Sequence, residues 1–276
     1  MILELGGGTA NRGAAPVART IAALEEARRG SVVRVSAPKG TEFTFRFPEH
    51  ARVHRNIGDA SREKVRDAVS ARDNDMARIV LVRHGHVEGI EPARFRGRRD
   101  VDLSDLGVRQ AQATARGIAL QWRPSTVYSS PLGRCIRTAE AIAAALGLSI
   151  AVLEDLNDLH YGDWEWRTYE EVRARWPALF DRWFAAPQMV RFPNGESLQD
   201  LVARTSNVLR LIRERHGQET VVVVGHSSGN RAVLLQTLDQ PLSAYWRLAQ
   251  DPCAVSEIED SDRDTTVHRF NETCSL

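Results

Sequence analysis

The chain has 276 residues, which suits one large α/β domain or one such domain with a small appendage. Hydrophobic residues make up 42% and charged residues 26%, ordinary globular values that argue against wholesale disorder, a collagen or a membrane protein. The formal net charge of +1 argues against a protein built to neutralise nucleic-acid phosphates, so no nucleic-acid partner is expected.

Three widely spaced cysteines, Cys135, Cys253 and Cys274, lack Cys or His partners at metal-ligand spacing, so neither a disulfide framework nor a zinc site is predicted. The first residues lack the basic segment and the long apolar run of a signal peptide, and no window approaches 18 uninterrupted apolar residues. We therefore expect a soluble, reduced, cytoplasmic protein that does not contact a membrane.

Residues 1–76 are predicted to form a small α+β domain followed by a linker, without evident catalytic residues. The pattern favours a helix at 17–28, strands at 32–35 and 43–47, and a polar helix with linker at 56–75. Residues 77–276 are predicted to form the second domain.

Two uninterrupted β-rich apolar runs, at 79–82 and 221–224, are typical of strands covered on both faces of a parallel sheet. Weaker strands are predicted at 126–128 and 149–153. Helical patterns alternate with these strands: one is capped by Ser104 and stops at Pro124, one runs from 134 to 146 and ends at Gly147, and one spans 196–216. This alternation predicts a three-layer α/β/α domain with a mostly parallel sheet.

The run Arg83-His84-Gly85, an RHG motif, directly follows the first strong strand, and His226 follows the other. Ligands of doubly wound sheets bind beyond the carboxyl ends of the strands, so both histidines can face one crevice. Arg134 opens a helix after a third strand, where a helix N-terminus favours anions. No Gly-rich phosphate loop and no carboxylate cluster for Mg²⁺ accompany these residues, so no metal or other cofactor is expected. The cluster suits a phosphoryl group attacked by a neutral imidazole and stabilised by guanidinium groups.

Blocks in a fixed order resemble the histidine phosphatase (phosphoglycerate mutase-like) superfamily over about residues 78–260. The matching blocks are residues 81–85, 94–104, 130–140, 156–165, 194–198, 224–226 and 254–258. The resemblance implies that His84 is the nucleophile that becomes phosphohistidine, and that Arg83, Arg134 and His226 hold the phosphoryl group. The substrate-binding candidates are Arg96 and Gly97 of the family's substrate loop, together with Glu88 and Ser227.

Asp158 stands where the family usually carries a glutamate as proton donor. An aspartate can do the same chemistry, but its carboxyl group reaches one methylene, roughly 1.3–1.5 Å, less far. Either the local backbone moves inward, or protonation of the leaving group is weaker, or Glu165, Glu88 or a group of the substrate helps. An ordinary loop or helix-capping role for Asp158 is the competing interpretation.

Four of the six tryptophans fall between residues 164 and 183, in the family's variable insertion over the active site. Most of these aromatic side chains are predicted to form a core, and one or two to shape a pocket for an organic phosphate.

The N-terminal part carries two short resemblances. Residues 30–48 resemble the last hairpin of histidine-kinase-type ATPase domains, but too little chain precedes them for an ATP site. Pro16-Val17 and the spacing to Gly30 resemble small TusA-like sulfur-carrier domains, but Gly13-Ala14 stands where that family has Cys-Pro. We therefore expect an appendage without its own chemistry.

The sequence as a whole predicts a hydrolase: a metal-independent phosphatase that acts on a small-molecule phosphate monoester through phosphohistidine. The alternatives are a phosphoglycerate-type phosphomutase, a catalytically weak protein that binds or senses a phosphate ligand and, less favoured because of the aromatic insertion, a protein phosphatase. Leu159 and Ser228 stand where mutases usually carry Arg and Asn, which favours hydrolysis. A homodimer is compatible with this interpretation.

Overall fold

The computed structural model describes residues 2–5, 32–37, 41–46, 76–88, 92–260 and 265–275. The chain divides into two compact units, residues 1–67 and 68–276. The helix predicted at 17–28 and the helix with linker predicted at 56–75 lie outside the described residues.

In the first unit, the described residues form a three-stranded antiparallel sheet in the order β1-β3-β2. The strands are β1 (Ile2–Leu5), β2 (Val32–Ala37) and β3 (Thr41–Arg46). The two strands predicted in this region are therefore confirmed, with Val33 opposite Phe45. The four-residue β1, which pairs along β3, is too short to give a recognisable alternating pattern.

In the second unit, the described strands form a six-stranded sheet in the order β6-β5-β7-β4-β8-β9. The strands are β4 (Ala77–Arg83), β5 (Thr126–Ser129), β6 (Ile150–Val152), β7 (Thr220–Gly225), β8 (Val255–Asp260) and β9 (Thr265–Glu272). Strands β6, β5, β7 and β4 are parallel to one another. Strand β8 is antiparallel to β4, and β9 is antiparallel to β8, so the mostly parallel sheet is confirmed.

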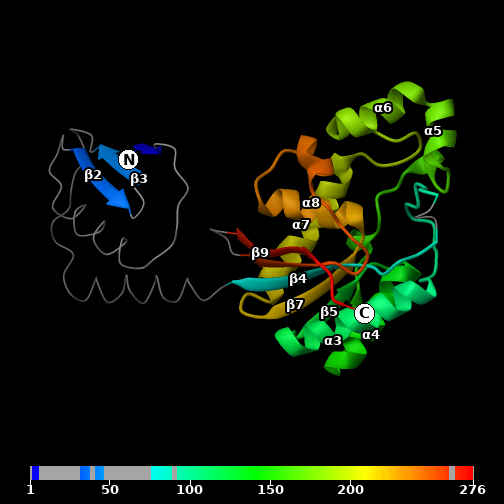
Figure 1. Cartoon of the computed structure of the whole chain (residues 1–276), viewed down its shortest axis with the longest axis horizontal. Coiled ribbons are helices and arrows are strands. Elements are labelled where there is room, and N and C mark those ends of the chain that lie inside the picture. The colour runs from blue at the N-terminus through cyan, green and yellow to red at the C-terminus, as the bar shows by residue number, and fades with distance from the viewer. Residues whose placement is uncertain are drawn as a thin grey trace. The chain divides into compact units, whose positions relative to one another are not determined.

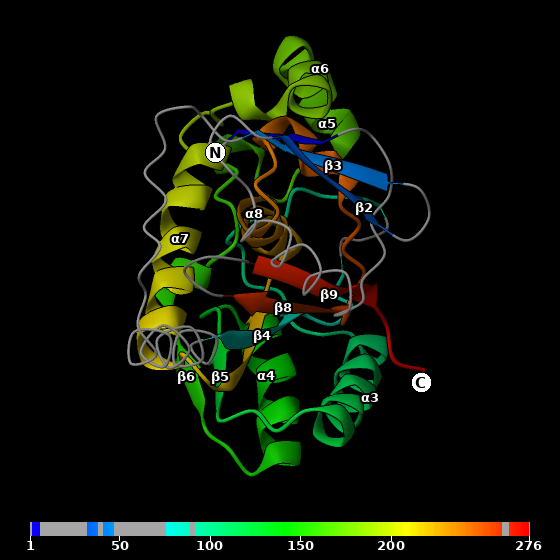
Figure 2. The same cartoon turned by 90° about the vertical axis from the view of Figure 1, so that its left-hand side faces the viewer.

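Helices cover both faces of this sheet. Helices α3 and α4 lie on one face and α7 and α8 on the other, and α5 and α6 extend from one end (Figure 1 and Figure 2). The helices are α3 (Asp105–Gln121), α4 (Gly133–Leu146), α5 (Tyr169–Arg175), α6 (Pro177–Ala185), α7 (Leu198–Arg215) and α8 (Ser227–Thr237). Short 3₁₀ turns connect them: η1 (Glu154–Leu156), η2 (Gly162–Trp164), η3 (Pro187–Met189) and η4 (Leu242–Arg247). The fold is therefore the expected three-layer α/β/α arrangement.

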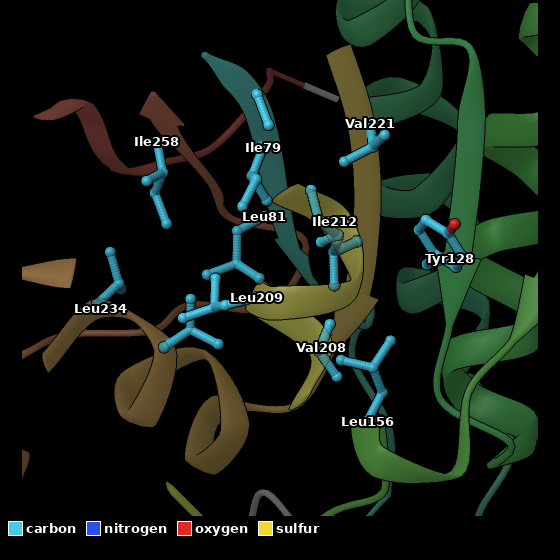
Figure 3. Close-up of a cluster of buried hydrophobic side chains, with 13 residues drawn as sticks. Ile79, Leu81, Tyr128, Leu156, Val208, Leu209, Ile212, Val221, Leu234 and Ile258 are labelled. Carbon is cyan, nitrogen blue, oxygen red and sulfur yellow. The ribbon is translucent and has the colours of Figure 1, made fainter. Parts of the chain in front are cut away.

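The uninterrupted apolar runs of β4 and β7 are explained by burial on both faces, because successive side chains of a strand point to opposite sides. One set packs against α7 and α8, where Figure 3 shows Ile79, Leu81 and Val221 beside residues of α7. The alternate set packs against α3 and α4; its members are Val80, Val82, Val222 and Val224.

Local signals in the sequence start and stop the helices as predicted. The Ser104 hydroxyl accepts the Gly107 amide hydrogen bond at 3.2 Å and caps α3. Gly147 ends α4 with φ of 68°, a left-handed conformation that favours glycine. Ser197 and Asp200 form a capping box at the start of α7.

The aromatic segment forms a third core cluster, as predicted for most of its members. Trp164, Trp183 and Phe192 are fully buried there. Trp166 and Phe184 lie outside this cluster, and Phe184 is exposed. Trp166 is half-buried, with the guanidinium carbons of Arg94 and Arg99 5.4 Å and 4.9 Å from its ring centre. Across the described helices, none is both long and apolar enough to cross a bilayer.

A matched pair of leucines tests this core. Leu81 is 2% exposed inside the cluster of Figure 3, whereas Leu120 on α3 is 81% exposed. We expect Leu81→Ala to lower the free energy of unfolding by about 2–5 kcal/mol through lost burial and a residual cavity. Leu120→Ala should change it by less than about 0.5 kcal/mol. Urea denaturation followed by circular dichroism measures both, and equal losses would contradict the packing described.

Candidate active site

Two adjacent parallel strands bring the two predicted histidines together. Arg83 of β4 is paired with Gly225 of β7, so His84 and His226 leave the sheet side by side. The His84 amide donates to the Gly225 carbonyl at 3.0 Å, and the two imidazole rings lie 5.2 Å apart between centres at 62°. With 2% and 1% exposure, both rings are removed from bulk water.

A hydrogen bond orients the His84 ring and leaves the lone pair of Nε2 available for reaction. Its Nδ1 lies 2.8 Å from the Gly85 carbonyl oxygen. A carbonyl only accepts hydrogen bonds, so Nδ1 carries the proton and Nε2 carries the lone pair. The Gly85 amide in turn donates to the Thr138 hydroxyl at 3.1 Å, which fixes the turn after β4 to helix α4.

His226 is held from two sides. Its Nδ1 lies 3.3 Å from Arg134 Nε, which can only donate, so the proton of the neutral ring is on Nε2. That nitrogen lies 2.8 Å from the hydroxyl of Ser130, the residue that follows β5. The Ser130 amide donates to Val224 at 3.0 Å, so the end of β5 is fastened to β7 next to the site.

Arg83 is buried and tied to the loop before β8. Its Nη1 donates to the Gln250 carbonyl at 2.5 Å, and its amide donates to Ala254 at 3.1 Å. The Cys253 amide donates to the His84 carbonyl at 3.2 Å, so residues 250–254 brace both active-site residues. Burial and the charges of Arg96 and Arg231 lower the pKa of Arg83 to about 10. Its Nε is a buried donor without a hydrogen-bond partner among the described residues.

Asp158 brings a carboxylate into this cluster of cations. It follows η1 and is 7% exposed, and its Oδ2 lies 3.1 Å from Arg134 Nη2 and 3.5 Å from His226 Nδ1. Its other oxygen, Oδ1, accepts from the Leu159 amide at 2.9 Å and from the Ser228 hydroxyl. The carboxyl group is therefore oriented on both oxygens, and it lies beside the histidine pair as the sequence predicts.

The environment keeps both imidazoles neutral. The pKa of His84 is well below its usual value because of burial first, and then because of the charges of Arg134 and Arg83. The pKa of His226 is lowered for the same reasons, with burial again the largest cause and Arg134 and Arg204 next. A neutral, oriented imidazole is the form that acts as a nucleophile.

The predicted substrate loop lies over Arg134. Arg134 Nη2 donates to the Gly97 carbonyl at 2.7 Å, and Nη1 donates to the Arg99 carbonyl at 2.8 Å. Gly97 has φ of +54°, a left-handed conformation that favours glycine, and a Cβ there would stand 2.4 Å from Oε1 of Glu165, whose side chain would have to move. Arg96 is half-buried within electrostatic reach of Asp158 and Arg134, and burial lowers its pKa.

The remaining candidates, Glu88 and Ser227, take part in none of the contacts described above. Glu88 is exposed on the turn after Val87. Ser227 is the first residue of α8 and is half-buried, whereas the hydroxyl that contacts Asp158 belongs to its neighbour Ser228. The part of the chain that the structure describes contains no group of three or more His, Cys, Asp or Glu side chains that could hold a metal ion.

Sequence reasoning missed two polar contacts that shape the site. Ser130 orients His226, and its only sequence signal is its place directly after β5. Asp100 accepts the Gly133 amide hydrogen bond at 2.8 Å at the start of α4. The helix N-terminus expected to attract an anion is therefore engaged by a carboxylate of the chain itself, and the positive charge at the site comes from side chains.

Comparison with known proteins identifies this arrangement. The family model of the histidine phosphatase superfamily (branch 1) matches residues 79–273, and the chain belongs to that superfamily. It is a phosphatase of the histidine phosphatase type, a phosphoric monoester hydrolase, as the sequence predicted.

Individual relatives bear different names. Phosphoserine phosphatase 1 of Hydrogenobacter thermophilus is 34% identical over 73% of this chain and 95% of its own length. A 2,3-bisphosphoglycerate-dependent phosphoglycerate mutase of Methylobacterium radiotolerans is 33% identical over 68% of this chain and 92% of its own length. Among solved structures, a mycobacterial glucosyl-3-phosphoglycerate phosphatase with VO3 superposes with a TM-score of 0.66 at 25% identity, covering 71% of this chain and 99% of that one.

From the two buried neutral histidines we predict how the free energy of unfolding depends on pH. Their pKa values are lowered in the folded state, so the unfolded chain takes up protons first as the pH falls below about 6.5. Above that pH the histidines are neutral in both states and do not weaken the fold. As the pH falls below it, the unfolded chain gains protons that the folded chain cannot take up, so the free energy of unfolding decreases until the pH reaches the lowered pKa values. His84→Gln removes one such group, so the decline in unfolding free energy from pH 7 to pH 5 should be shallower. Urea titrations in phosphate-free buffer measure it, and an unchanged decline would show that His84 is not held neutral.

Proposed function

We propose that the protein hydrolyses a small-molecule phosphate monoester through a phosphohistidine at His84, without a metal ion. The observation that carries this proposal is the oriented lone pair of His84 Nε2 within a buried group of cations. Those cations supply the positive charge that metal ions supply in other phosphatases.

In the first step, Nε2 of His84 attacks phosphorus in line and the bond from phosphorus to the ester oxygen breaks. Arg83 and Arg134 hold the equatorial oxygens, and the unpartnered Nε of Arg83 is a donor that a phosphate oxygen would satisfy. His226 contributes through Nε2–H, the one donor of its neutral ring, which lies against the Ser130 hydroxyl in the free site. Asp158 in its protonated form gives its proton to the leaving oxygen.

In the second step, a water molecule attacks the phosphorus of the phosphohistidine. Asp158, now ionised, takes a proton from that water, and the bond from Nε2 to phosphorus breaks. Inorganic phosphate is released, and His84 and Asp158 return to their starting states.

Phosphoserine is the first substrate that we propose to test. The support is the similarity to the Hydrogenobacter phosphoserine phosphatase over nearly its whole length. A further cation, Arg96, lies within electrostatic reach of Arg134 and Asp158 and suits the carboxylate of such a substrate. We infer that Arg96 and Gly97 contact the substrate, and that Glu88 and Ser227 lie at the rim of the site.

A phosphomutase is the second candidate, favoured by the similarity to the Methylobacterium mutase. Such an enzyme must keep its phosphohistidine and bind both ends of a phosphoglycerate. The apolar Leu159 is fully buried, and Ser228 is engaged with Asp158. Neither residue therefore offers the polar contact to the second end of a phosphoglycerate that a mutase needs. Hydrolysis is the better supported reaction.

Phosphate release from a panel of esters in EDTA tests the proposal. We expect turnover that His84→Ala abolishes and Asp158→Asn lowers by 10²–10⁴-fold, the usual contribution of general acid–base catalysis. Acid-labile, base-stable labelling of the wild type by ³²P-substrate would report phosphohistidine.

Two outcomes would overturn the proposal. Transfer that requires a bisphosphate primer would identify a mutase. Binding of phosphate esters without turnover of any of them would leave a binding protein on a phosphatase fold.

A further inference from the structure

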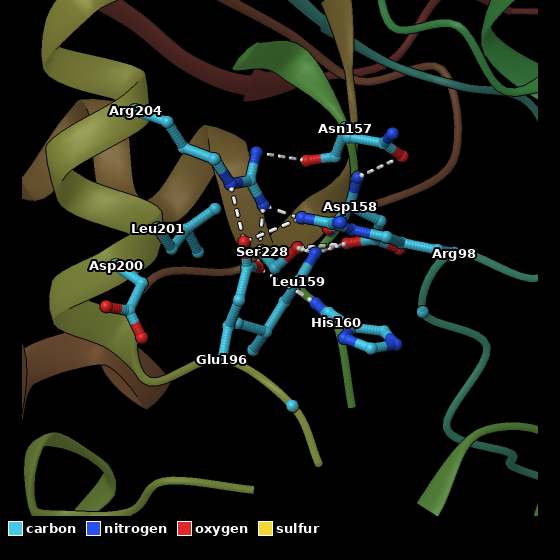
Figure 4. Close-up of polar contacts among 12 residues, drawn as sticks. Arg98, Asn157, Asp158, Leu159, His160, Glu196, Asp200, Leu201, Arg204 and Ser228 are labelled. Atoms are coloured by element: carbon cyan, nitrogen blue, oxygen red, sulfur yellow. Dashed lines mark hydrogen bonds and ion pairs between the residues drawn. The ribbon is translucent and has the colours of Figure 1, made fainter. Parts of the chain in front are cut away.

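An ion pair outside the reacting groups holds the backbone that carries Asp158 (Figure 4). Arg204 lies on α7, and Glu196 lies just before Ser197, the residue that caps that helix. Arg204 Nη2 is 3.1 Å from Glu196 Oε2, and Arg204 Nε is 3.2 Å from Glu196 Oε1. The two side chains are 12% and 17% exposed, so solvent screens this pair only in part.

The remaining donors of Arg204 bind three backbone carbonyl oxygens of residues 155–158, the segment that carries Asp158. Nη1 donates to the carbonyl oxygens of Asp155 at 2.9 Å and Asn157 at 2.5 Å, and Nη2 donates to that of Asp158 at 2.9 Å. With the two bonds to Glu196, all five N–H groups of the guanidinium are used. A lysine has three donors and no planar fork, so it cannot reproduce this arrangement.

Glu196 holds the other side of the segment. Its Oε2 accepts the His160 amide at 3.0 Å, two residues beyond Asp158. Its Oε1 also accepts from Arg98 at 2.6 Å, and Arg98 belongs to the loop that covers Arg134. The backbone is thus fixed before, at and after Asp158 by side chains anchored on one end of a long helix.

This restraint matters because the proton donor is an aspartate. Its carboxyl group stands one methylene from Cα, so its position follows the backbone more closely than that of a glutamate. The Leu159 amide already fixes Oδ1 at 2.9 Å, and a shift of the segment would therefore carry the carboxyl group away from the substrate. A displacement of about 1 Å at a catalytic group can lower a rate about 10²-fold.

We propose that Glu196 and Arg204 are positioning residues that place the Asp158 carboxyl group against the leaving oxygen and so offset the short reach of aspartate. The inference rests on the proposed role of Asp158 as proton donor.

The nature of the leaving group separates positioning from a merely structural role. An alkoxide leaves only with a proton, whereas p-nitrophenolate is a weak base that leaves as the anion. A misplaced acid therefore slows the hydrolysis of phosphoserine and leaves that of p-nitrophenyl phosphate nearly unchanged. General destabilisation lowers the active fraction and affects both esters equally.

The experiment compares kcat/KM for the two esters in the wild type, Arg204→Lys and Glu196→Gln. Arg213→Lys is the matched control, because Arg213 lies on the same helix and its guanidinium binds both oxygens of Asp260 at 2.6 Å and 2.8 Å. We expect Arg204→Lys to lower kcat/KM for phosphoserine at least tenfold more than for p-nitrophenyl phosphate. Arg213→Lys should change the ratio of the two values less than twofold. If another alkyl ester proves the better substrate in the panel, it replaces phosphoserine.

Asp158→Asn, measured in parallel, separates the role of Asp158 as the acid from the positioning role of Glu196 and Arg204. If it slows both esters equally, Asp158 is not the acid and the proposed function loses that step. If it is selective for the alkyl ester while Arg204→Lys and Glu196→Gln slow both esters equally, the positioning inference alone is wrong. Should Arg204→Lys not fold, Glu196→Gln decides, since it keeps one acceptor for the His160 amide and removes the charge that holds Arg204.

Discussion

Burying two arginines beside two histidines is unfavourable unless an opposite charge accompanies them, and here Asp158 supplies it. Its carboxylate lies 3.1 Å from Arg134 Nη2, in a site from which water is largely excluded. Removing one member of a buried ion pair typically costs 3–5 kcal/mol, because the other charge is left unpaired. Asp158 is therefore a structural counter-ion and a candidate acid at once, and a change at this position affects both stability and catalysis.

Even with Asp158 ionised, the site keeps an excess of positive charge. Burial first, and then this excess charge, lowers the pKa of both histidines, and the site also holds a buried donor, Arg83 Nε, without a hydrogen-bond partner among the described residues. A dianionic ligand would reduce the repulsion between these buried positive groups and so stabilise the folded protein. Ligands that bind only the native state stabilise it in proportion to the logarithm of their concentration. The unfavourable electrostatics of the site and its fit to a dianionic ligand thus have one cause.

Much of the fold and of the candidate site could be predicted from the sequence, because local patterns indicate the strands and the residues that follow them. The apolar runs predicted β4 and β7, and chain direction then placed His84 and His226 at one edge of the sheet. Strands β8 and β9 escaped prediction because their charged residues, such as Glu257 and Arg269, break the apolar pattern while pairing with each other at 3.3 Å. The contacts of Arg204 were also hidden, since they go to backbone carbonyls, which leave no trace in side-chain patterns. Sequence motifs thus indicated the reacting groups, whereas the groups that hold them in place are recognised only from their contacts in the folded protein.

The place of β4 in the sheet has a consequence for biosynthesis. Both of its neighbours, β7 and β8, come from the last quarter of the chain, and residues 250–254 brace Arg83 and His84. On the ribosome, His84 is made long before anything that can pair with its strand. Such pairings between distant segments are slow to form, and apolar strands stay exposed while they wait. A nascent chain that stops short of β8 carries the complete RHG run and yet lacks the strand and the loop that brace Arg83 and His84.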